Sequence, residues 1–506
     1  MTERSPIRRA LISVSDKQGL DRLGPALAAA GVQVIASGGT RKALVEFGVP
    51  TLAVSDLTGS PEMLDGRVKT LHPKIHGALL ADTTNPQHLR DLEANGIEPI
   101  DLLVANLYPF AETVASSKAD NEVIENIDIG GPAMIRAAAK NHGRMVVVTD
   151  PAEYEFIIAA LARGGTTLDE RRRLATEAFA HTGRYDALIH AWLNGEGMGD
   201  HLLVALDRVK TLRYGENPHQ QAALYRQAGA EGWVFEARQL QGKELSFNNY
   251  ADGESTWRLA NRIAHPGCVV VKHLNPCGVA QRPTVYEAFV AARKCDPLSA
   301  FGGVAAVNDL LDADTASEMA KMFLEVVICP AITDEAASIL AKKKNLRVLV
   351  ARPPEQQTLD MRMIGGGALV QDADRREIGE WKTVSESKPT PEQVRQLQLA
   401  WTVGAHCKSN SIVIVQDDAA VGIGVGDQSR VGAAERAVGQ AGDRLNGAVA
   451  ASEALIPFRD GLDALANAGV VALVETGGSV KDQEVIDAAN EHGMVLMFTG
   501  MRHFRH

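Results

Sequence analysis

The stretch VVVKHLNPCGVA, from Val269 to Ala280, joins an apolar run to a short polar segment. Three consecutive valines predict a buried strand, and Lys272, His273 and Asn275 follow where that strand ends. Open α/β sheets bind their ligands at the carboxyl ends of strands, so we expect these side chains to border a ligand crevice. Pro276, Cys277 and Gly278 are expected to form a turn.

Lys272 and His273 are candidates for an acid/base pair. Each cation disfavours protonation of the other, and burial lowers both pKa values, which leaves an imidazole neutral at pH 7 and able to accept a proton from a weak nucleophile. The alternative is a strand end at which Lys and His only meet solvent. This stretch alone does not favour either interpretation.

The size and composition of the chain indicate a multidomain globular protein. Its 506 residues exceed the length of roughly 250–300 residues at which single cores stop growing. A net charge of −11 and a pI near 5.7 argue against nucleic acid or an anionic membrane as a partner of the whole surface. They leave room for local cationic pockets that bind small phosphorylated ligands.

The spacing of the cysteines and the lengths of the apolar runs bear on where in the cell the protein is expected. The 5 cysteines are widely spaced and form no C-x-x-C pair, which favours a reducing environment over a disulfide framework or a zinc site. We find neither a secretory signal nor an apolar run of about 18 residues. We therefore expect a cytoplasmic protein.

Residues 8–50 alternate between strand and helix patterns, which predicts a parallel sheet. Two strand-to-helix turns, SVSDK (13–17) and ASGGT (36–40), combine small residues, hydroxyls and a lysine. Backbone N–H groups at a helix N-terminus bind anions, so the two turns together predict a phosphate site. The alternative for each turn taken singly is a capped helix start.

Three further segments of the N-terminal half carry polar groups at expected strand or helix ends. GRVKTLHPKIHGALL (66–80) is expected to be a basic loop that binds an anion or is simply solvated. DLLVANLYPF (101–110) predicts a strand followed by Asn106 and Tyr108. NIDIGG (126–131) opens an Ala-rich helix, where Asp128 either caps the helix or faces a substrate.

The segment 152–193 is expected to be helical throughout, and the glycine-rich NGEGMGD (194–200) places a domain boundary near 195–205. Beyond it, Arg213 and Tyr214 lie in a polar loop, and Glu325 precedes an apolar strand. The glycines of 422–426 are expected between a strand and a helix, where they are weak evidence for a phosphate site.

Taken in order, these motifs resemble a known family. SVSDK, ASGGT, GRVKTLHP, NLYPF, IDIGG with RAAAKN, LRYGENPHQ, VKHLNPCGVA, SAFGG, KSNSI and GMRHFRH are similar to the bifunctional PurH family of purine biosynthesis. Its two activities are AICAR (5-aminoimidazole-4-carboxamide ribonucleotide) formyltransferase and IMP cyclohydrolase. The resemblance implies an α/β fold with a methylglyoxal-synthase-like cyclohydrolase domain in 1–200. It implies a transformylase of two cytidine-deaminase-like halves in 201–506, and a homodimer.

The resemblance also implies roles for individual residues. Catalytic residues would be His273 and Lys272 in the transformylase, and Lys140, Tyr108 and Asp128 in the cyclohydrolase. The cyclohydrolase nucleotide would meet Ser15, Asp16, Lys17, Ser37, Gly38, Gly39, Thr40, Arg67, Lys69, Thr70, Asn106 and Ile129. AICAR would meet Arg213, Tyr214, Gly302, Glu325, Asn410 and Arg502, and folate would meet Ile423, Pro457, Phe458, Asp460 and Ser479.

The implied ligands are AICAR, formyl-AICAR, IMP and the co-substrate 10-formyltetrahydrofolate, with no metal, nucleic acid or membrane. The chain departs from the family pattern at Asp427, at Leu455–Ile456 and in ETGGS. Two alternatives are a nucleotide-binding regulatory protein without turnover, motivated by these departures, and a zinc nucleobase deaminase. The H-x-E with P-C-x-x-C pattern of the deaminase is absent.

Overall fold

The computed structural model describes residues 4–61, 63–64, 68–116, 119–195, 197–375 and 378–506. The chain forms two compact units. The first comprises Met1–Arg208 with Tyr225–Ala230, and the second comprises Val209–Leu224 with Glu231–His506. The chain passes between them within β6 (Leu206–Leu212) and β7 (Ala222–Gln227), which pair as a two-stranded sheet.

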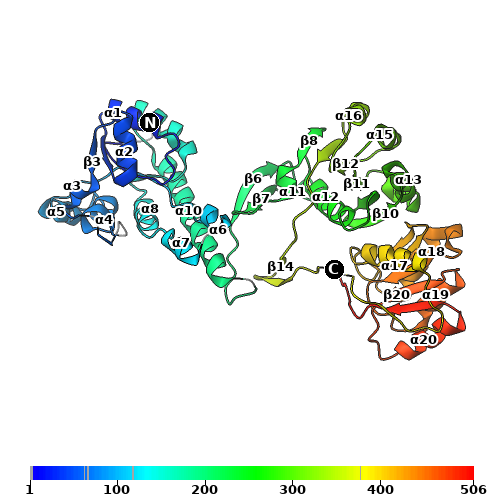
Figure 1. Ribbon diagram of the computed structural model, residues 1–506. Helices are drawn as coiled ribbons and strands as arrows, with labels where there is room; N and C mark the ends of the chain where they lie inside the picture. Colours follow the sequence, from blue (N-terminus) through cyan, green and yellow to red (C-terminus); the bar gives the residue numbers. More distant parts are fainter. Residues whose placement is uncertain (1–3, 62, 65–67, 117–118, 196, 376–377) are drawn as a thin grey trace. The chain divides into compact units, whose positions relative to one another are not determined.

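The first unit contains a parallel five-stranded sheet in the order β3-β2-β1-β4-β5 (Figure 1). Its strands are β1 (Arg9–Ser13), β2 (Gln33–Ala36), β3 (Thr51–Ala53), β4 (Leu102–Ala105) and β5 (Val146–Val148). The helices are α1 (Leu20–Ala29), α2 (Gly38–Glu46), α3 (Val54–Thr58), α4 (Pro73–Leu80), α5 (Pro86–Ala94), α6 (Phe110–Ala115), α7 (Asp120–Glu125), α8 (Gly130–Lys140), η2 (Pro151–Glu153), α9 (Tyr154–Ala162) and α10 (Leu168–Asn194).

Both faces of this sheet are buried, which explains the continuous apolar strands. Along β1, Leu11 belongs to the core beneath α4, α8 and α10, whereas Ala10 and Ile12 belong to the core beneath α1 and α9. Strand order reverses between β1 and β4, so the crevice at their carboxyl ends is the expected ligand position for such a sheet.

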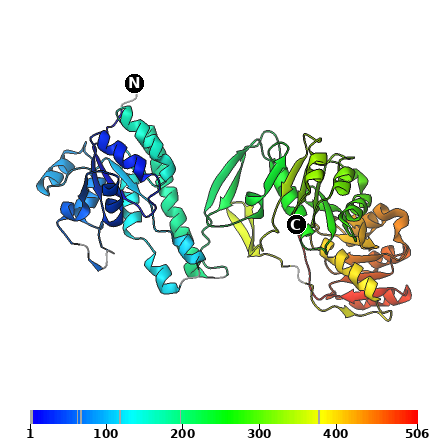
Figure 2. The ribbon, with the colours of Figure 1, turned by 45° about the horizontal axis from the view of Figure 1, so that its top comes forward.

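Two expectations for this unit are corrected. The segment 152–193 is not one helix, because α9 ends at Ala162 and α10 begins only at Leu168; Figure 2 shows α10 as one long helix of its own. Gly165, between the two helices, has φ +118°, and a Cβ there would lie 2.0 Å from the Ser5 carbonyl oxygen, so only glycine fits at this position. The basic segment 66–80 is not entirely a loop, since α4 begins at Pro73, which suits the first turn of a helix.

The second unit is built on a mixed 12-stranded sheet in the order β16-β21-β20-β19-β17-β18-β10-β9-β11-β12-β13-β8. Its strands are β8 (Arg238–Gln241), β9 (Gly267–Lys272), β10 (Asn275–Gln281), β11 (Val304–Val307), β12 (Val326–Cys329), β13 (Arg347–Val350), β16 (Lys382–Thr383), β17 (Ile412–Gln416), β18 (Ala419–Gly424), β19 (Val449–Ser452), β20 (Ala472–Glu475) and β21 (Val495–Phe498). Its helices are α11 (Trp233–Glu236), α12 (Phe247–Ala260), α13 (Val285–Cys295), α14 (Pro297–Ala300), α15 (Ala313–Met319), α16 (Asp334–Leu340), α17 (Pro391–Gly404), α18 (Arg430–Ala441), η3 (Gly442–Leu445), α19 (Arg459–Asn467) and α20 (Asp482–Glu491).

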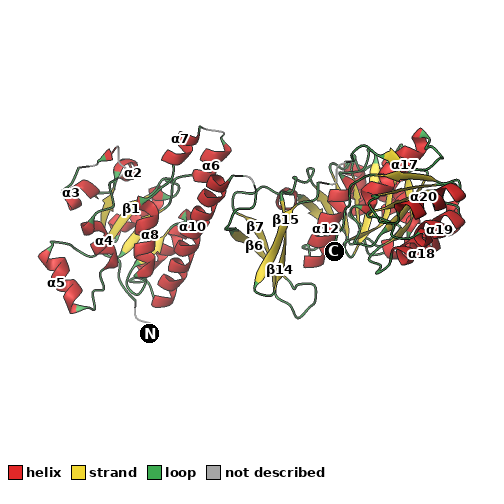
Figure 3. Cartoon of the chain, turned by 90° about the horizontal axis from the view of Figure 1, so that it is seen from below, coloured by secondary structure: helices red, strands yellow, loops and turns green. Residues whose placement is uncertain are grey.

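This unit consists of two halves with the same succession of elements. Each half runs from an outer strand through a helix and a β-hairpin to three further strands, each preceded by helix. The halves join where β10 pairs antiparallel with β18, at Ala280 and Ala419. Helices α12 and α17 cover one face of the sheet over a shared core (Figure 3). The predicted α/β class, with a parallel N-terminal sheet and a two-halved C-terminal region, is confirmed.

The glycines of the central hairpins are strand residues, which corrects two expectations. Pro276, Cys277 and Gly278 lie within β10 rather than in a turn, and Gly422 and Gly424 lie within β18. A Cβ on Gly278 would lie 2.1 Å from the carbonyl oxygen of Ala292 on α13. Gly278, Gly422 and Gly424 lack a side chain because a helix packs directly on the strand backbone at each of these positions.

The hairpin of β14 (Leu359–Ile364) and β15 (Gly367–Asp372) pairs with no other strand among the described residues (Figure 1). Its register places Leu359, Met361 and Met363 on one face with Ala368 and Val370. The Met363 side chain is 77% exposed. No helix in the described part of the chain is long and apolar enough to cross a membrane.

Candidate functional site

The loops after β1 and β4 meet at the switch point of the first sheet. The Asn106 Oδ1 accepts hydrogen bonds from the backbone N–H groups of Ser15 (2.6 Å) and Asp16 (3.1 Å), and its Nδ2 donates to the Asp16 carbonyl (3.0 Å). The buried Thr40 hydroxyl accepts from the Val14 N–H and donates to the Val14 carbonyl. These contacts fix the loop of 14–17 against β4 and α2.

The N-terminus of α2 lies between two lysines. Gly38 and Gly39 form its first turn, and a Cβ built on Gly38 would lie 2.7 Å from the Lys69 Nζ. A Cβ on Gly39 would lie 3.7 Å from the Lys17 Cε. Two ammonium groups beside free helical N–H groups form a cationic cradle, which suits a phosphate.

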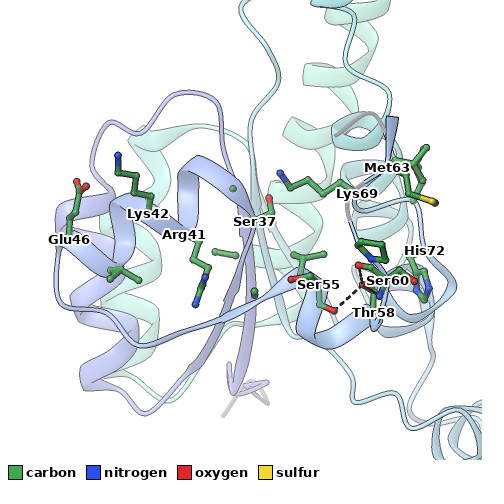
Figure 4. A pocket seen from close by; sticks show the side chains of 18 residues that line it. Ser37, Arg41, Lys42, Glu46, Ser55, Thr58, Ser60, Met63, Lys69 and His72 are labelled. Carbon is green, nitrogen blue, oxygen red and sulfur yellow. Dashed lines mark hydrogen bonds between the residues drawn. The ribbon is translucent and has the colours of Figure 1, made fainter. Parts of the chain in front are cut away.

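A pocket of about 700 Å³ opens from this cradle (Figure 4). Ser37 and Lys69 line its inner end, and Lys69 extends towards the middle of the pocket. Ser55 and Thr58 of α3 form another wall, and the Thr58 hydroxyl donates to carbonyls of its own turn. The pocket is large enough for a nucleotide-sized ligand.

Asp128 stands at the N-terminus of α8. Its Oδ1 accepts from the Gly131 N–H at 2.8 Å. Burial raises the pKa of this carboxyl, although hydrogen bonds from the backbone of Gly131 and Tyr108 oppose that effect. A Cβ on Gly130 would lie 2.9 Å from the Thr70 Oγ1. The segment of Lys69 and Thr70 therefore joins the α2 cradle to the α8 N-terminus.

Other predicted cyclohydrolase residues differ in their placement. The Tyr108 and Ile129 side chains are exposed beside Asp128. Lys140 is the last residue of α8, about 15 Å along the helix from Gly130 at 1.5 Å per residue. The structure therefore does not bring Lys140 to the Asp128 end of the helix. Arg67 lies outside the described residues.

In the second unit, His273 occupies a strained hairpin turn. His273 and Leu274 have φ values of 52° and 67°, the left-handed conformation that costs non-glycine residues about 1–2 kcal/mol each. The Asp252 Oδ1 accepts from the Leu274 N–H at 2.8 Å, and the Ser255 hydroxyl donates to the Leu274 carbonyl at 2.9 Å. Helix α12 thus holds the turn that presents His273.

Lys272 and two neighbouring strand starts meet at the same sheet edge. The Lys272 Nζ donates to the Phe301 carbonyl at 2.7 Å and would lie 3.9 Å from a Cβ on Gly302, whose φ is +73°. The Glu325 N–H donates to the Gly303 carbonyl. The Glu325 carboxylate pairs with the buried Arg347 guanidinium at 2.7 Å.

The second half completes this edge. The Asn275 Oδ1 accepts from the Lys408 N–H at 3.1 Å, which joins the His273 hairpin to the segment that carries Asn410. The C-terminal tail is anchored there, because the Ser409 N–H donates to the Arg505 carbonyl at 2.8 Å. The sequence-predicted His273, Gly302, Glu325 and Asn410 therefore lie along one edge of the sheet.

Two predicted substrate arginines stack on aromatic rings. The Arg213 guanidinium lies 4.8 Å from the centre of the Tyr214 ring, and Arg502 lies 4.5 Å from that of Phe504. The loop of Arg213 touches α12 where the Asn248 Nδ2 donates to the Glu216 carbonyl. The Arg213 Nη2 also donates to the Tyr214 hydroxyl at 3.0 Å. Stacking uses the face of a guanidinium, so its other N–H groups can bind an anion.

Four of the five predicted folate residues cluster at the ends of β19 and β20. Pro457, Phe458 and Asp460 flank the start of α19, Ser479 follows β20, and the Lys481 Nζ lies 4.7 Å from the Phe458 ring centre. Ile423 differs. It is 5% exposed and belongs to the hydrophobic core, so a direct contact between its side chain and folate is not supported.

Among the described residues, no three His, Cys, Asp or Glu side chains are grouped so that they could hold a metal ion. Cys277 is buried beside β9, and burial raises the pKa of its thiol to about 12. Its Sγ contacts the Val270 carbonyl at 3.5 Å. A neutral thiol of this kind is a packing residue rather than a zinc ligand.

The residues that support the sites were not predicted from the sequence. Tyr185 of α10 donates to the Asn126 carbonyl and accepts from the Asp128 N–H, while Asp252 and Ser255 hold the His273 turn. Tyr185 lies 57 and 59 positions from its two partners, whereas Asp252 and Ser255 lie 22 and 19 positions before Leu274. The only sequence feature that could have indicated these supporting residues is a carboxyl or hydroxyl side chain within a helix that is otherwise packed against the core.

These features define an α/β enzyme with two separate polar sites, one in each unit. Residues 138–440 match the family described as AICARFT/IMPCHase bienzyme, and residues 20–133 match the MGS-like domain. The chain belongs to the AICARFT/IMPCHase bienzyme family. Both the family and the methylglyoxal-synthase-like N-terminal domain predicted from the sequence are confirmed.

Close relatives extend over the whole chain. Proteins named bifunctional purine biosynthesis protein PurH share 49% identity in Rhodospirillum rubrum, 48% in Acidithiobacillus ferrooxidans and 46% in Mycobacterium marinum, each over 99% of both chains. A solved structure described as ForH is 32% identical over 38% of this chain and all of its own. Its TM-score of 0.34 is too low to bear on the fold.

Proposed function

We propose that this chain is a bifunctional purine-biosynthesis enzyme. It transfers the formyl group of 10-formyltetrahydrofolate to AICAR, and then closes formyl-AICAR to IMP with loss of water. The observation that carries the proposal is the His273 turn, which is held in a strained conformation next to Lys272, on the hairpin whose Asn275 contacts the segment that carries Asn410. Strain of this kind persists where the surrounding structure enforces it, commonly at active sites.

Formyl transfer assigns a role to each group at this edge. The AICAR amine is a poor nucleophile, because its lone pair is delocalised into the ring. His273 takes its proton as the amine attacks the formyl carbon, and such base catalysis is worth about a hundred- to ten-thousand-fold. Negative charge develops on the formyl oxygen, to which Lys272 or Asn410 donates. The folate nitrogen then leaves and takes up a proton.

Substrate binding at this edge draws on Arg213 and Arg502, whose N–H groups suit the AICAR phosphate. Gly302 and Glu325 lie against the Lys272 side of the site. Pro457, Phe458, Asp460 and Ser479 supply a partly aromatic surface for the folate, which acts as co-substrate. The assigned roles are all filled by side chains, without a metal.

Ring closure is assigned to the first unit. The nucleotide phosphate binds at the α2 N-terminus between Lys17 and Lys69, with Ser15, Asp16 and the residues 37–40 around it. The carboxamide nitrogen attacks the formyl carbon near Asp128, Tyr108 and Asn106, where holding the chain in a folded pose lowers the barrier. Asp128, whose pKa is raised, moves a proton from the carboxamide nitrogen to the formyl oxygen, and the resulting hydroxyl leaves as water with the proton of the formylated amine. Lys140 has no step in this scheme.

We also propose a homodimer in the cytoplasm. The apolar face of the β14–β15 hairpin supports the dimer, because an isolated two-stranded hairpin is marginally stable and Met361 and Met363 are exposed on it. Free and buried cysteines support a reducing compartment. The partners are small nucleotides and reduced folate.

The test is a coupled assay that follows AICAR and 10-formyltetrahydrofolate to IMP. His273→Ala is expected to abolish formyl transfer and to leave the closure of added formyl-AICAR intact, because the two sites lie in different units. Survival of formyl transfer would refute the role of His273. Loss of both activities in a folded variant would refute the assignment of the two activities to separate units.

A further inference from the structure

We propose that Arg430 and Glu453 are positioning residues, whose buried ion pair fixes which way the Asn410 carboxamide points. In this arrangement Asn410 presents an N–H, and not its carbonyl oxygen, to the formyl oxygen. The inference rests on the proposed formyl transfer, and it concerns two residues that no motif singled out.

The three residues form one connected chain of contacts. The Arg430 Nη2 donates to the Asn410 Oδ1 at 2.8 Å. The Arg430 Nη1 pairs with the Glu453 carboxylate and also donates to the Ser411 carbonyl at 2.9 Å. The Glu453 Oε2 in turn accepts from the Ser411 N–H and hydroxyl, both at 3.0 Å. Ser411 directly follows Asn410, so both members of the ion pair are hydrogen-bonded to this segment.

The orientation of Asn410 follows from the hydrogen-bonding capacity of its neighbours. A guanidinium only donates, so the atom facing Arg430 must be the amide oxygen. A backbone carbonyl only accepts, so the atom facing the Asp427 carbonyl, at 3.0 Å, must be the amide nitrogen. One N–H of that nitrogen has no partner among the residues that the structure describes. Half-buried Asn410 can donate it to a substrate.

The Arg430–Glu453 ion pair is buried rather than exposed at the surface. The Arg430 and Glu453 side chains are 5% and 0% exposed, and they come from different elements, the start of α18 and the loop after β19. Buried ion pairs contribute little net stability compared with apolar packing, although each charge becomes costly once its partner is removed. The Arg430–Glu453 pair adds little stability and yet holds the Asn410 amide. We therefore explain the pair by its effect on the orientation of this amide.

The chemical consequence concerns the developing oxyanion. An N–H donor aimed at such an oxygen is worth about a hundred- to thousand-fold in kcat. A flipped amide would present its carbonyl oxygen to the same negative charge and repel it. Charge assistance from Arg430 also polarises the amide, which strengthens the remaining N–H as a donor.

The test compares Arg430→Lys with Arg395→Lys in the full chain. A lysine retains the charge opposite Glu453, but its three N–H groups all lie on one nitrogen, which cannot reach both Glu453 and Asn410 as the two guanidinium nitrogens do. We expect Arg430→Lys to lower kcat for formyl transfer about ten- to a hundredfold with a change in the AICAR KM below about threefold. Arg395 is an exposed arginine on α17 that pairs with Asp418, and its lysine variant is expected to leave both activities unchanged.

A double-mutant cycle separates positioning from general destabilisation. In an Asn410→Ala background, Arg430→Lys is expected to cost less than about twofold, because the group that it orients is gone. An equal loss in both backgrounds would overturn the inference, as would an unchanged kcat in Arg430→Lys. Cyclohydrolase activity and AICAR binding of each preparation show that both units are folded.

The same cycle distinguishes this inference from the proposed function. If His273→Ala abolishes formyl transfer while Arg430→Lys and Asn410→Ala act independently, only the positioning role fails. If formyl transfer survives His273→Ala, the proposed function itself fails. Glu453→Gln provides a second check, because it leaves Arg430 without its counter-charge and should lower the same kcat in the same direction.

Discussion

Replacing Glu475 by glutamine tests how a buried carboxyl holds the loops beside the predicted folate residues. The Glu475 side chain has no exposed surface, and its Oε2 accepts from the backbone N–H groups of Ile456 (3.0 Å) and Gly477 (3.2 Å). The first loop leads to Phe458 and the second to Ser479. Glutamine retains a carbonyl oxygen that can accept from both backbone N–H groups, and it carries no charge. The variant therefore preserves the two hydrogen bonds and removes the ionisable group.

The magnitude follows from the pKa, which burial raises from 4.5 to about 7. Below pH 4.5 the carboxyl is protonated in both the folded and the unfolded chain. Between pH 4.5 and about 7 the unfolded chain ionises while the folded chain does not, so stability is lost as pH rises. The difference between about 7 and 4.5, at about 1.4 kcal/mol per pH unit, is worth about 3 kcal/mol.

The assay is urea unfolding of the full chain, followed by tryptophan fluorescence at pH 5 and pH 8. Of the 5 tryptophans, only Trp192 lies in the first unit, so the signal reports mainly the second. Between pH 5 and pH 8, the unfolding free energy of wild type should fall by about 3 kcal/mol more than that of Glu475→Gln, which has no titrating group at this position. Glu435→Gln, an exposed change on α18, is the matched control. A difference between wild type and Glu475→Gln that does not vary with pH would refute the reasoning.

Three other substitutions test particular contacts. Asp252→Ala removes the acceptor that holds the His273 turn, and formyl transfer should fall at least about tenfold with ring closure unchanged. Gly38→Ala places a methyl group 2.7 Å from the Lys69 Nζ at φ +47°, and the KM of the cyclohydrolase should rise about tenfold in steady-state kinetics, with formyl transfer as the control. Gly278→Ala forces a methyl group into a helix carbonyl, and thermal denaturation should show a loss of about 3 kcal/mol or more.

Each of these outcomes can be contradicted directly. Unchanged formyl transfer in Asp252→Ala would mean that the turn holds its shape without α12. A Gly38→Ala variant that loses both activities would have lost its fold rather than its cradle. Gly365→Ala, in a position open to solvent, is the control for Gly278→Ala, and equal stability of the two variants would contradict the packing argument.

The sequence by itself predicted the features that depend on neighbouring residues. Apolar runs such as Val269–Val271 predicted buried strands, because a strand covered on both faces needs no polar side. SVSDK and ASGGT predicted an anion site, since the residues that free backbone N–H groups lie within one turn of each other. The order of the motifs also identified the family.

Only the tertiary structure decided which distant groups meet. It placed the bend of the central hairpin at His273 and Leu274 rather than at Pro276–Gly278, because α13 packs on the β10 backbone and Asp252 secures the turn. It left Lys140 a helix length away from Asp128. Contacts of this kind join residues up to hundreds of positions apart, and their geometry is set by how helices and sheets pack, which no local pattern encodes.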